Sequence, residues 1–219
     1  MPNAVIFDLD GLLLESEQVW NGSKRRLTAE RGGCWKPEAE HAMLGMSSPE
    51  WSRYMHDELE VPLDPEEISH EVVRLMIESY RRSMPLLPGA DEAVHAAAGR
   101  WPLGLASSSN REIIDAVLAR TGWSELFAVT VSSEEVERGK PAPDVYLEAA
   151  RGLRAAPESC VAVEDSNAGI RSALAAGMGV VAIPNDAYPP DPDVLERATL
   201  VLDSLHDLDG EAIERGGLR

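Results

Sequence analysis

Two spacings of hydrophobic residues divide the chain. Between about residue 16 and residue 82 the apolar positions recur with helical periodicity, which predicts amphipathic helices. From about residue 88 onward, short apolar runs alternate with helical segments, a pattern typical of a parallel α/β sheet. We expect helices over residues 17–30, 37–44, 48–58 and 64–82 in the first part, and in the second part helices over 90–98, 110–121, 143–152 and 166–177 with strands over 103–106, 129–131, 161–163, 179–183 and 199–202.

An isolated strand precedes the helical part. The apolar run over residues 5–7 stops at Asp8-Leu9-Asp10-Gly11, and a lone strand has no ladder partner among helices, so we expect it to join the later sheet. A Pro- and Gly-containing stretch at 84–89 marks a boundary. The sequence therefore predicts an α/β fold, with a Rossmann-like parallel sheet built from 1–15 and 86–219 and a helical domain inserted at 16–85. Because open α/β sheets bind ligands at the carboxyl ends of their strands, we expect the insertion to act as a lid there.

Composition excludes several classes of protein. The chain has 219 residues, 44% of them hydrophobic, and a formal charge of −18, which disfavours binding to nucleic acids and to anionic membranes. Two cysteines, Cys34 and Cys160, are too few for a disulfide scaffold, and the first residues lack the pattern of a signal peptide, so we expect a cytoplasmic protein. Five histidines show no metal-ligand spacing and are expected at the surface.

Two pairs of acidic residues follow predicted strands. Asp8 and Asp10 are expected at the end of the first strand, where side chains two residues apart point the same way, and Glu164 and Asp165 are expected to end the strand at 161–163. Two carboxylates held close together either separate their pKa values or bind a hard cation such as Mg²⁺. Each pair alone could be a solvated turn or an acidic helix cap, but neither alternative explains why both pairs end core strands.

Two further polar segments also follow strands. Ser107 and Ser108 precede a predicted helix, where hydroxyl and backbone N–H groups can hold an anion, although a simple serine-rich cap gives the same pattern. Lys140 lies between Gly139 and Pro141 in a stiff turn, where it could neutralise a phosphoryl group or could be an ordinary solvated lysine.

Together these segments resemble the four motifs of the haloacid dehalogenase-like phosphohydrolases, and the helical insertion resembles the cap of the subgroup that includes β-phosphoglucomutase. The resemblance implies that Asp8 is the nucleophile and that Asp10 is the general acid and base. It implies that Ser107, Ser108 and Lys140 hold the phosphoryl oxygens.

The resemblance also implies a Mg²⁺ cofactor. Asp8, the backbone carbonyl of Asp10 and Asp165 would be its ligands, with Glu164 either a further ligand or a hydrogen-bond partner of the ligands.

The resemblance leaves three activities open: a phosphatase acting on small phosphorylated metabolites, a phosphosugar mutase, and a silent phosphate- or partner-binding protein. The family's mutases use a His and an Arg from the cap, and here Trp20 and Ser48 stand in those places, so a phosphatase is favoured. The expected substrates are sugar or nucleoside monophosphates, and a monomer is the default for a chain this acidic. Substrate-pocket candidates in the insertion are Glu17, Trp20, Met46 and Ser47.

Overall fold

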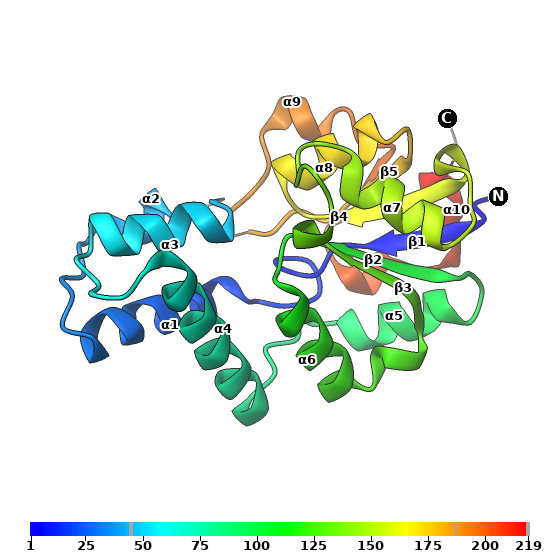
Figure 1. Cartoon of the computed structure of the whole chain (residues 1–219). Helices are drawn as coiled ribbons and strands as arrows, with labels where there is room; N and C mark the ends of the chain where they lie inside the picture. Colours follow the sequence, from blue (N-terminus) through cyan, green and yellow to red (C-terminus); the bar gives the residue numbers. More distant parts are fainter. Residues whose placement is uncertain (44–45, 187, 218–219) are drawn as a thin grey trace. The chain divides into compact units, whose positions relative to one another are not determined.

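The computed structural model describes residues 1–43, 46–186 and 188–217. The chain divides into two compact units, one made of residues 1–15 and 85–219 and the other of residues 16–84 (Figure 1). Within the described residues, no helix is both long enough and apolar enough to cross a lipid bilayer.

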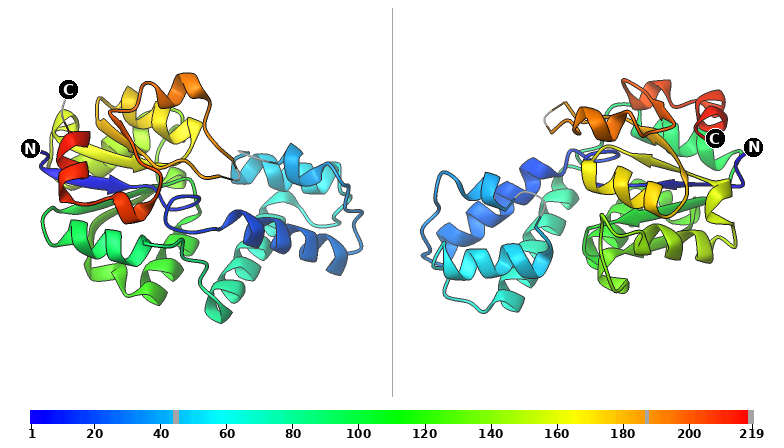
Figure 2. Two further views of the ribbon diagram at one scale, coloured as in Figure 1. Left: turned by 180° about the vertical axis from the view of Figure 1, so that it is seen from behind. Right: turned by 90° about the horizontal axis from the view of Figure 1, so that it is seen from above.

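The discontinuous unit is built on a parallel sheet with the strand order β3-β2-β1-β4-β5-β6. Helices cover both faces, as the two views of Figure 2 show: α7 and α8 lie on one face, and α5, α6 and α10 lie on the other. The strands are β1 (Ala4–Phe7), β2 (Leu103–Ser107), β3 (Phe127–Ser132), β4 (Cys160–Glu164), β5 (Gly179–Ala182) and β6 (Leu200–Val201). The helices are α5 (Ala90–Ala98), α6 (Arg111–Thr121), α7 (Asp144–Gly152), α8 (Asn167–Ala175), α9 (Pro192–Leu195) and α10 (Gly210–Gly216).

The first strand lies in the centre of this sheet. β1 pairs with β2 on one side, with Phe7 opposite Leu105, and with β4 on the other, with Phe7 opposite Val163. All four residues of β1 are buried, because helices cover both faces of the sheet. The expectation that the isolated first strand joins the later sheet is confirmed.

The 16–84 unit is helical. Its helices are α1 (Glu17–Glu30), α2 (Ala39–Ala42), α3 (Ser48–Asp57) and α4 (Pro65–Arg82). α4 begins at a capping box in which Asp64 accepts from the Glu67 N–H, and its apolar stripe packs against α1 and α3. The stripe includes Val72 and Met76, which are fully buried.

Most expected elements are present, with some differences in length. The helix expected over 37–44 is only the four-residue α2, and Leu44 lies outside the described residues. β1 ends at Phe7, so Asp8 and Asp10 stand in the loop that follows the strand rather than on the strand itself. The short helices α9 and α10 are additions that the pattern did not predict.

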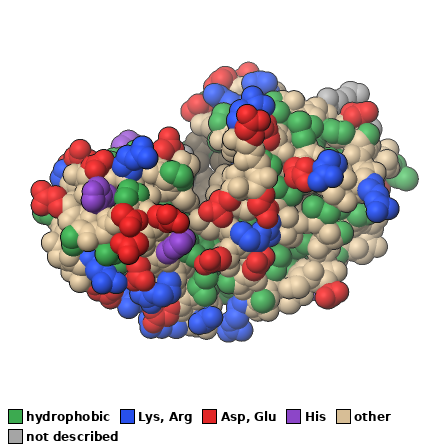
Figure 3. Space-filling view, in the orientation of Figure 1, with side chains coloured by type: hydrophobic (Ala, Val, Ile, Leu, Met, Phe, Trp, Pro, Cys, Tyr) green, Lys and Arg blue, Asp and Glu red, His purple; other side chains and the backbone are tan. Residues whose placement is uncertain are grey.

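Charged side chains of both signs are scattered over the face drawn in Figure 3. Figure 3 shows acidic side chains interspersed with lysine and arginine over the visible face. All five histidines are exposed, as expected, and both cysteines are free, with Cys160 buried at the start of β4.

Candidate active site

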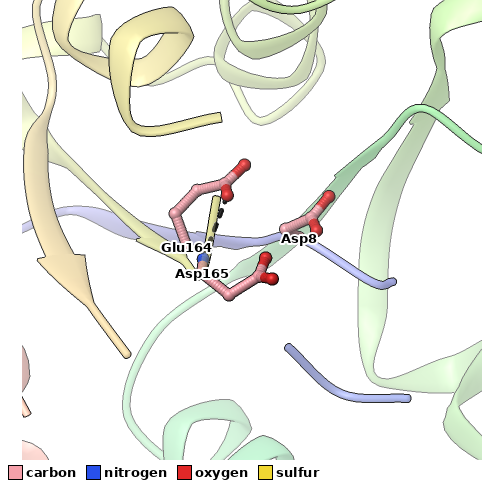
Figure 4. A group of neighbouring side chains, drawn as sticks. All are labelled: Asp8, Glu164 and Asp165. Carbon is pink, nitrogen blue, oxygen red and sulfur yellow. Dashed lines mark hydrogen bonds between the residues drawn. The ribbon is translucent and has the colours of Figure 1, made fainter. Parts of the chain in front are cut away.

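The carboxyl ends of the central strands bring the acidic pairs together. Asp8 follows Phe7 of β1 and Glu164 follows Val163 of β4, and because Phe7 and Val163 are opposite each other, the two acids are neighbours. The Asp8 N–H continues the ladder by donating to the Val163 carbonyl at 3.0 Å. Figure 4 shows Asp8, Glu164 and Asp165 gathered at this edge. All three are buried.

Lys140 joins the two strand ends. Its Nζ donates to Asp8 Oδ1 at 2.5 Å and to Glu164 Oε1 at 2.6 Å, and its side chain is only 4% exposed. The Tyr146 hydroxyl donates to the same Glu164 oxygen at 2.7 Å, and the Tyr146 ring centroid lies 5.1 Å from Nζ. Lys140 is therefore a buried cation shared by two carboxylates, which excludes the interpretation as a solvated loop lysine.

Burial sets the ionisation of this cluster. Burial raises the pKa of Asp8 to about 7, with Lys140 opposing the rise and Glu164 adding to it. Burial and the Glu164 charge also raise the pKa of Asp165 well above its ordinary value. Burial alone would lower the pKa of Lys140, but the Asp8 and Glu164 carboxylates outweigh it and raise that pKa. One ammonium thus faces three carboxylates, and a second cation would lower their repulsion.

The arrangement fits a hard divalent cation. Asp8, Glu164 and Asp165 each offer a carboxylate oxygen within 4.8 Å of the others. Asp165 Oδ1 is buried and has no hydrogen-bond partner within the described residues, so it is available as a ligand. Gly11 has φ +87° and lies next to the Asp165 carboxylate. A Cβ at this position would come 2.3 Å from Asp165 Oδ2, so any residue other than glycine would displace the carboxylate. Oxygen donors of this kind suit Mg²⁺.

Glu164 differs from the other two acids because both its oxygens are already engaged. Oε1 accepts from Lys140 and Tyr146, while Oε2 accepts from the Asp165 N–H at 3.1 Å and from the Ser166 hydroxyl at 3.2 Å. Gly169 in α8 packs against the same carboxylate, and a Cβ there would overlap it. These contacts favour Glu164 as a residue that orients the cluster rather than as a direct ligand.

Asp10 is held by serines. Its Oδ2 accepts from the Ser109 hydroxyl at 2.6 Å and from the Ser107 hydroxyl at 3.3 Å. Its Oδ1 is buried and has no hydrogen-bond partner within the described part of the chain. Ser132 supports this loop by donating to the Ser109 carbonyl at 2.7 Å. Ser108, expected to bind phosphate, is exposed between its two buried neighbours.

Three residues near the cluster were missed by the sequence reasoning. Ser109 follows Ser107 by two positions, a spacing that could have indicated a shared side of the chain. Tyr146 carries no such signal, because only the fold brings α7 against the Glu164 carboxylate. Asn185, after β5, donates to the Gly11 carbonyl at 3.2 Å and so supports the turn after Asp10.

The substrate-pocket candidates of the 16–84 unit lie on α1 and before α3. Glu17 accepts from the Asn21 amide at 3.1 Å, and the Trp20 and Trp51 rings make an edge contact with centroids 5.8 Å apart. Met46 is half-buried, and Ser47 forms the capping box of α3 through Glu50. The Gly45 position of the expected Gly45-Met46-Ser47 turn lies outside the described residues.

Comparisons with known proteins agree on one family. A family model for haloacid dehalogenase-like hydrolases matches residues 2–177. The probable pseudouridine-5'-phosphatase of Drosophila melanogaster is 32% identical, with 94% of this chain and 91% of that protein covered. The bifunctional riboflavin kinase/FMN phosphatase of Arabidopsis thaliana is 31% identical over all of this chain, which spans 56% of that protein's length. The crystal structure of CbbY from Rhodobacter sphaeroides in complex with phosphate superposes with a TM-score of 0.88 at 25% identity, covering 98% of this chain and 100% of that one.

Proposed function

The chain belongs to the haloacid dehalogenase-like hydrolases and is an enzyme of the phosphoric monoester hydrolase type, and from this premise we propose that it hydrolyses small phosphomonoesters of sugars or nucleosides through an aspartyl-phosphate on Asp8. The observation that carries the proposal is the buried Lys140, which bridges Asp8 and Glu164 beside Asp165. A cation fixed against the nucleophile is what a carboxylate needs in order to approach a dianionic phosphoryl group.

Asp8 is proposed as the nucleophile. Its carboxylate attacks phosphorus, the bond to the ester oxygen breaks, and the alkoxide leaves. Lys140 holds Asp8 in place and offsets the negative charge of the phosphoryl oxygens. Mg²⁺, held by Asp8 and Asp165 with the Asp10 carbonyl, would add positive charge at the same oxygens.

Asp10 is proposed as the acid and then the base. Ser107 and Ser109 hold its Oδ2, and this leaves the buried Oδ1 as the oxygen that gives a proton to the departing alkoxide. The same oxygen then accepts a proton from the water that hydrolyses the aspartyl-phosphate. Ser107 and Ser108 are proposed to hold the phosphoryl group through hydroxyl or backbone N–H donors.

The 16–84 unit is proposed as a cap that reads the leaving group through Glu17, Trp20, Met46 and Ser47. The places where a mutase of this family carries a His and an Arg hold Trp20 and Ser48, which supports hydrolysis over transfer back to a sugar.

The test is phosphate release from a panel of sugar and nucleoside monophosphates, with Mg²⁺ and with EDTA. Wild type is expected to release phosphate only with the metal, and Asp8→Asn is expected to release none. Asp193→Asn is the matched control, because Asp193 is 77% exposed and should not affect turnover. Metal-independent release, or activity in Asp8→Asn, would contradict the mechanism. Interconversion of glucose 1- and 6-phosphates with little phosphate release would instead support a mutase.

A further inference from the structure

The Glu164 carboxylate lies close enough to Asp8 and Asp165 to bind the same cation. One carboxylate oxygen from each of the three residues lies within 4.8 Å of the others, and Glu164 is fully buried. Figure 4 shows the three side chains at the ends of β1 and β4. Distance alone therefore does not decide whether Glu164 is a metal ligand.

The hydrogen bonds of Glu164 decide it instead. Oε1 accepts from the Lys140 ammonium at 2.6 Å and from the Tyr146 hydroxyl at 2.7 Å. A carboxylate oxygen offers two lone pairs, so these two donors fill Oε1. Oε2 accepts from the Asp165 N–H at 3.1 Å, and from the N–H and the hydroxyl of Ser166 at 3.3 and 3.2 Å. These contacts take up the acceptor capacity of both oxygens.

Among these donors, Tyr146 is a neutral side chain that comes from another element of the fold. Lys140 also holds Asp8, and the donors to Oε2 belong to the two residues that follow Glu164. Tyr146 lies on α7, is fully buried, and donates its hydroxyl to Glu164 from that helix. Removal of this hydroxyl would free one lone pair on Oε1 and leave the charges of the cluster unchanged.

The Glu164 carboxylate also has no room to turn toward α8. Gly169 of that helix lies so close that a Cβ there would come 1.8 Å from Oε1. An oxygen that loses a donor therefore cannot relax in that direction, because the helix backbone already fills the space. The freed lone pair would stay beside Asp8 and Asp165, where a cation could use it.

The number of carboxylates at a site affects which divalent ion it binds. Mg²⁺ takes about six ligands in a tight octahedron and keeps several waters, so one or two carboxylates are enough. Ca²⁺ takes roughly six to eight oxygens at longer distances and binds carboxylates through one or both oxygens. With Glu164 engaged elsewhere, the cluster offers Asp8 and Asp165, which suits Mg²⁺. A third carboxylate would suit Ca²⁺.

We propose that Tyr146 is a positioning residue that sets the metal preference of the site. Its hydroxyl keeps Glu164 from coordinating the cation, and the site therefore prefers Mg²⁺ to Ca²⁺. This inference rests on the proposed function, in which the cluster binds a divalent ion, but it concerns the choice of ion and is measured by binding rather than by phosphate release.

Titration calorimetry of the metal-free protein with Mg²⁺ and with Ca²⁺ tests the inference. Wild type should bind Mg²⁺ more tightly than Ca²⁺. In Tyr146→Phe the dissociation constant for Ca²⁺ should fall by roughly 10- to 100-fold, the value of the hydrogen bond to a charged group that Ca²⁺ no longer has to displace. The dissociation constant for Mg²⁺ should change by less than about threefold, because Mg²⁺ completes its shell with water.

Two controls separate this effect from a loss of packing. Tyr54→Phe removes a hydroxyl from a half-buried tyrosine of the 16–84 unit, and its ratio of Ca²⁺ to Mg²⁺ dissociation constants should equal that of wild type. In a Glu164→Gln background, Tyr146→Phe should leave the ratio unchanged, because the gain in Ca²⁺ affinity comes through the Glu164 carboxylate. A merely structural defect would weaken the binding of both ions and would not lower the ratio.

The catalytic result does not decide this test. If wild type releases phosphate from no ester and Tyr146→Phe still shows the expected change in ratio, the proposed function fails and the inference stands. The inference is overturned by a Tyr146→Phe ratio within threefold of wild type, or by the same fall in ratio in the Glu164→Gln background. It is also overturned if wild type binds neither ion, or binds Ca²⁺ at least as tightly as Mg²⁺.

Discussion

Replacing Lys140 by methionine is expected to destabilise the metal-free protein strongly. Methionine fills a similar volume but leaves Asp8 and Glu164 facing each other without the ammonium that bridges them at 2.5 and 2.6 Å. Breaking a buried ion pair by removing one partner costs about 3–5 kcal/mol. Even with Lys140 present, the pKa of Asp8 is about 7 instead of 3.8, and a rise of about 3 pKa units corresponds to roughly 4 kcal/mol. The ionised form of Asp8 is therefore already unfavourable in the metal-free protein, and the loss of Lys140 adds to that cost.

The loss should depend on pH. Because the folded state holds a proton on Asp8 more tightly than the unfolded state, stability falls as pH rises from about 4 towards the folded-state pKa. In Lys140→Met the folded-state pKa of Asp8 is higher still, so the free energy of unfolding of this variant keeps falling at pH values where that of wild type has levelled off. The difference from wild type should therefore be smaller at pH 6 than at pH 8, changing by at most about 1.4 kcal/mol per pH unit for one proton.

Urea unfolding in EDTA, followed by tryptophan fluorescence at pH 6 and pH 8, measures both effects. Lys36→Met is the control, since its partner Glu58 is 55% exposed and a surface pair contributes about 1 kcal/mol or less. Adding Mg²⁺ should recover part of the loss in Lys140→Met, because the cation replaces the missing positive charge. If Lys140→Met in EDTA stays within 1 kcal/mol of wild type at both pH values, the account of this cluster is wrong.

Three other changes have expected outcomes. Asp10→Asn should reduce turnover of alkyl phosphates by about 10²-fold or more while sparing Mg²⁺ affinity, and unaltered kcat would assign proton transfer elsewhere. Gly11→Ala should weaken Mg²⁺ binding at least tenfold by calorimetry, because its Cβ meets Asp165; Gly32→Ala, also at positive φ but in open space, controls for backbone strain. Lys24→Met should stabilise the protein by roughly 1–2 kcal/mol at pH 7. The pKa of Lys24 is lowered from 10.5 to about 8, which corresponds to about 3 kcal/mol of unfavourable burial of the ammonium group. The substitution also removes the contacts of the ammonium group with the two nearby indole rings, which stabilise the wild type by about 1–2 kcal/mol. The gain should shrink between pH 8 and pH 10.5, where the unfolded wild type binds more protons than the folded one, and a constant gain in melting temperature would contradict this.

The sequence predicted the layout of the fold well, because periodicity is a direct consequence of burial. The stripe of Val72 and Met76 identified α4, and the run before Asp8 identified the central strand. The pattern failed where an element is short. α10 has seven residues with glycine at both ends, so its apolar side shows little periodicity.

The site was predictable only where its residues end strands. Asp8 and Glu164 met as expected because parallel strands deliver their ends to one edge. Tyr146 and the pairing of Ser109 with Asp10 depend on side-chain contacts between elements far apart in the chain, and no local pattern encodes them. Lys24 looks in sequence like a solvated helical lysine, and only the packing of α1 near Trp51 shows that it is buried.

The central place of β1 affects how the chain folds during synthesis. Its neighbours β2 and β4 begin at Leu103 and Cys160, so the strand that carries the nucleophile leaves the ribosome long before either partner exists. At roughly 5–20 residues per second, the interval before β4 emerges is about 8–30 s. The 16–84 unit is complete well within that time and is built from local helical contacts, which form fastest. We therefore expect nascent chains stalled after residue 120 to protect α1 and α4 from proteolysis while leaving β1 accessible.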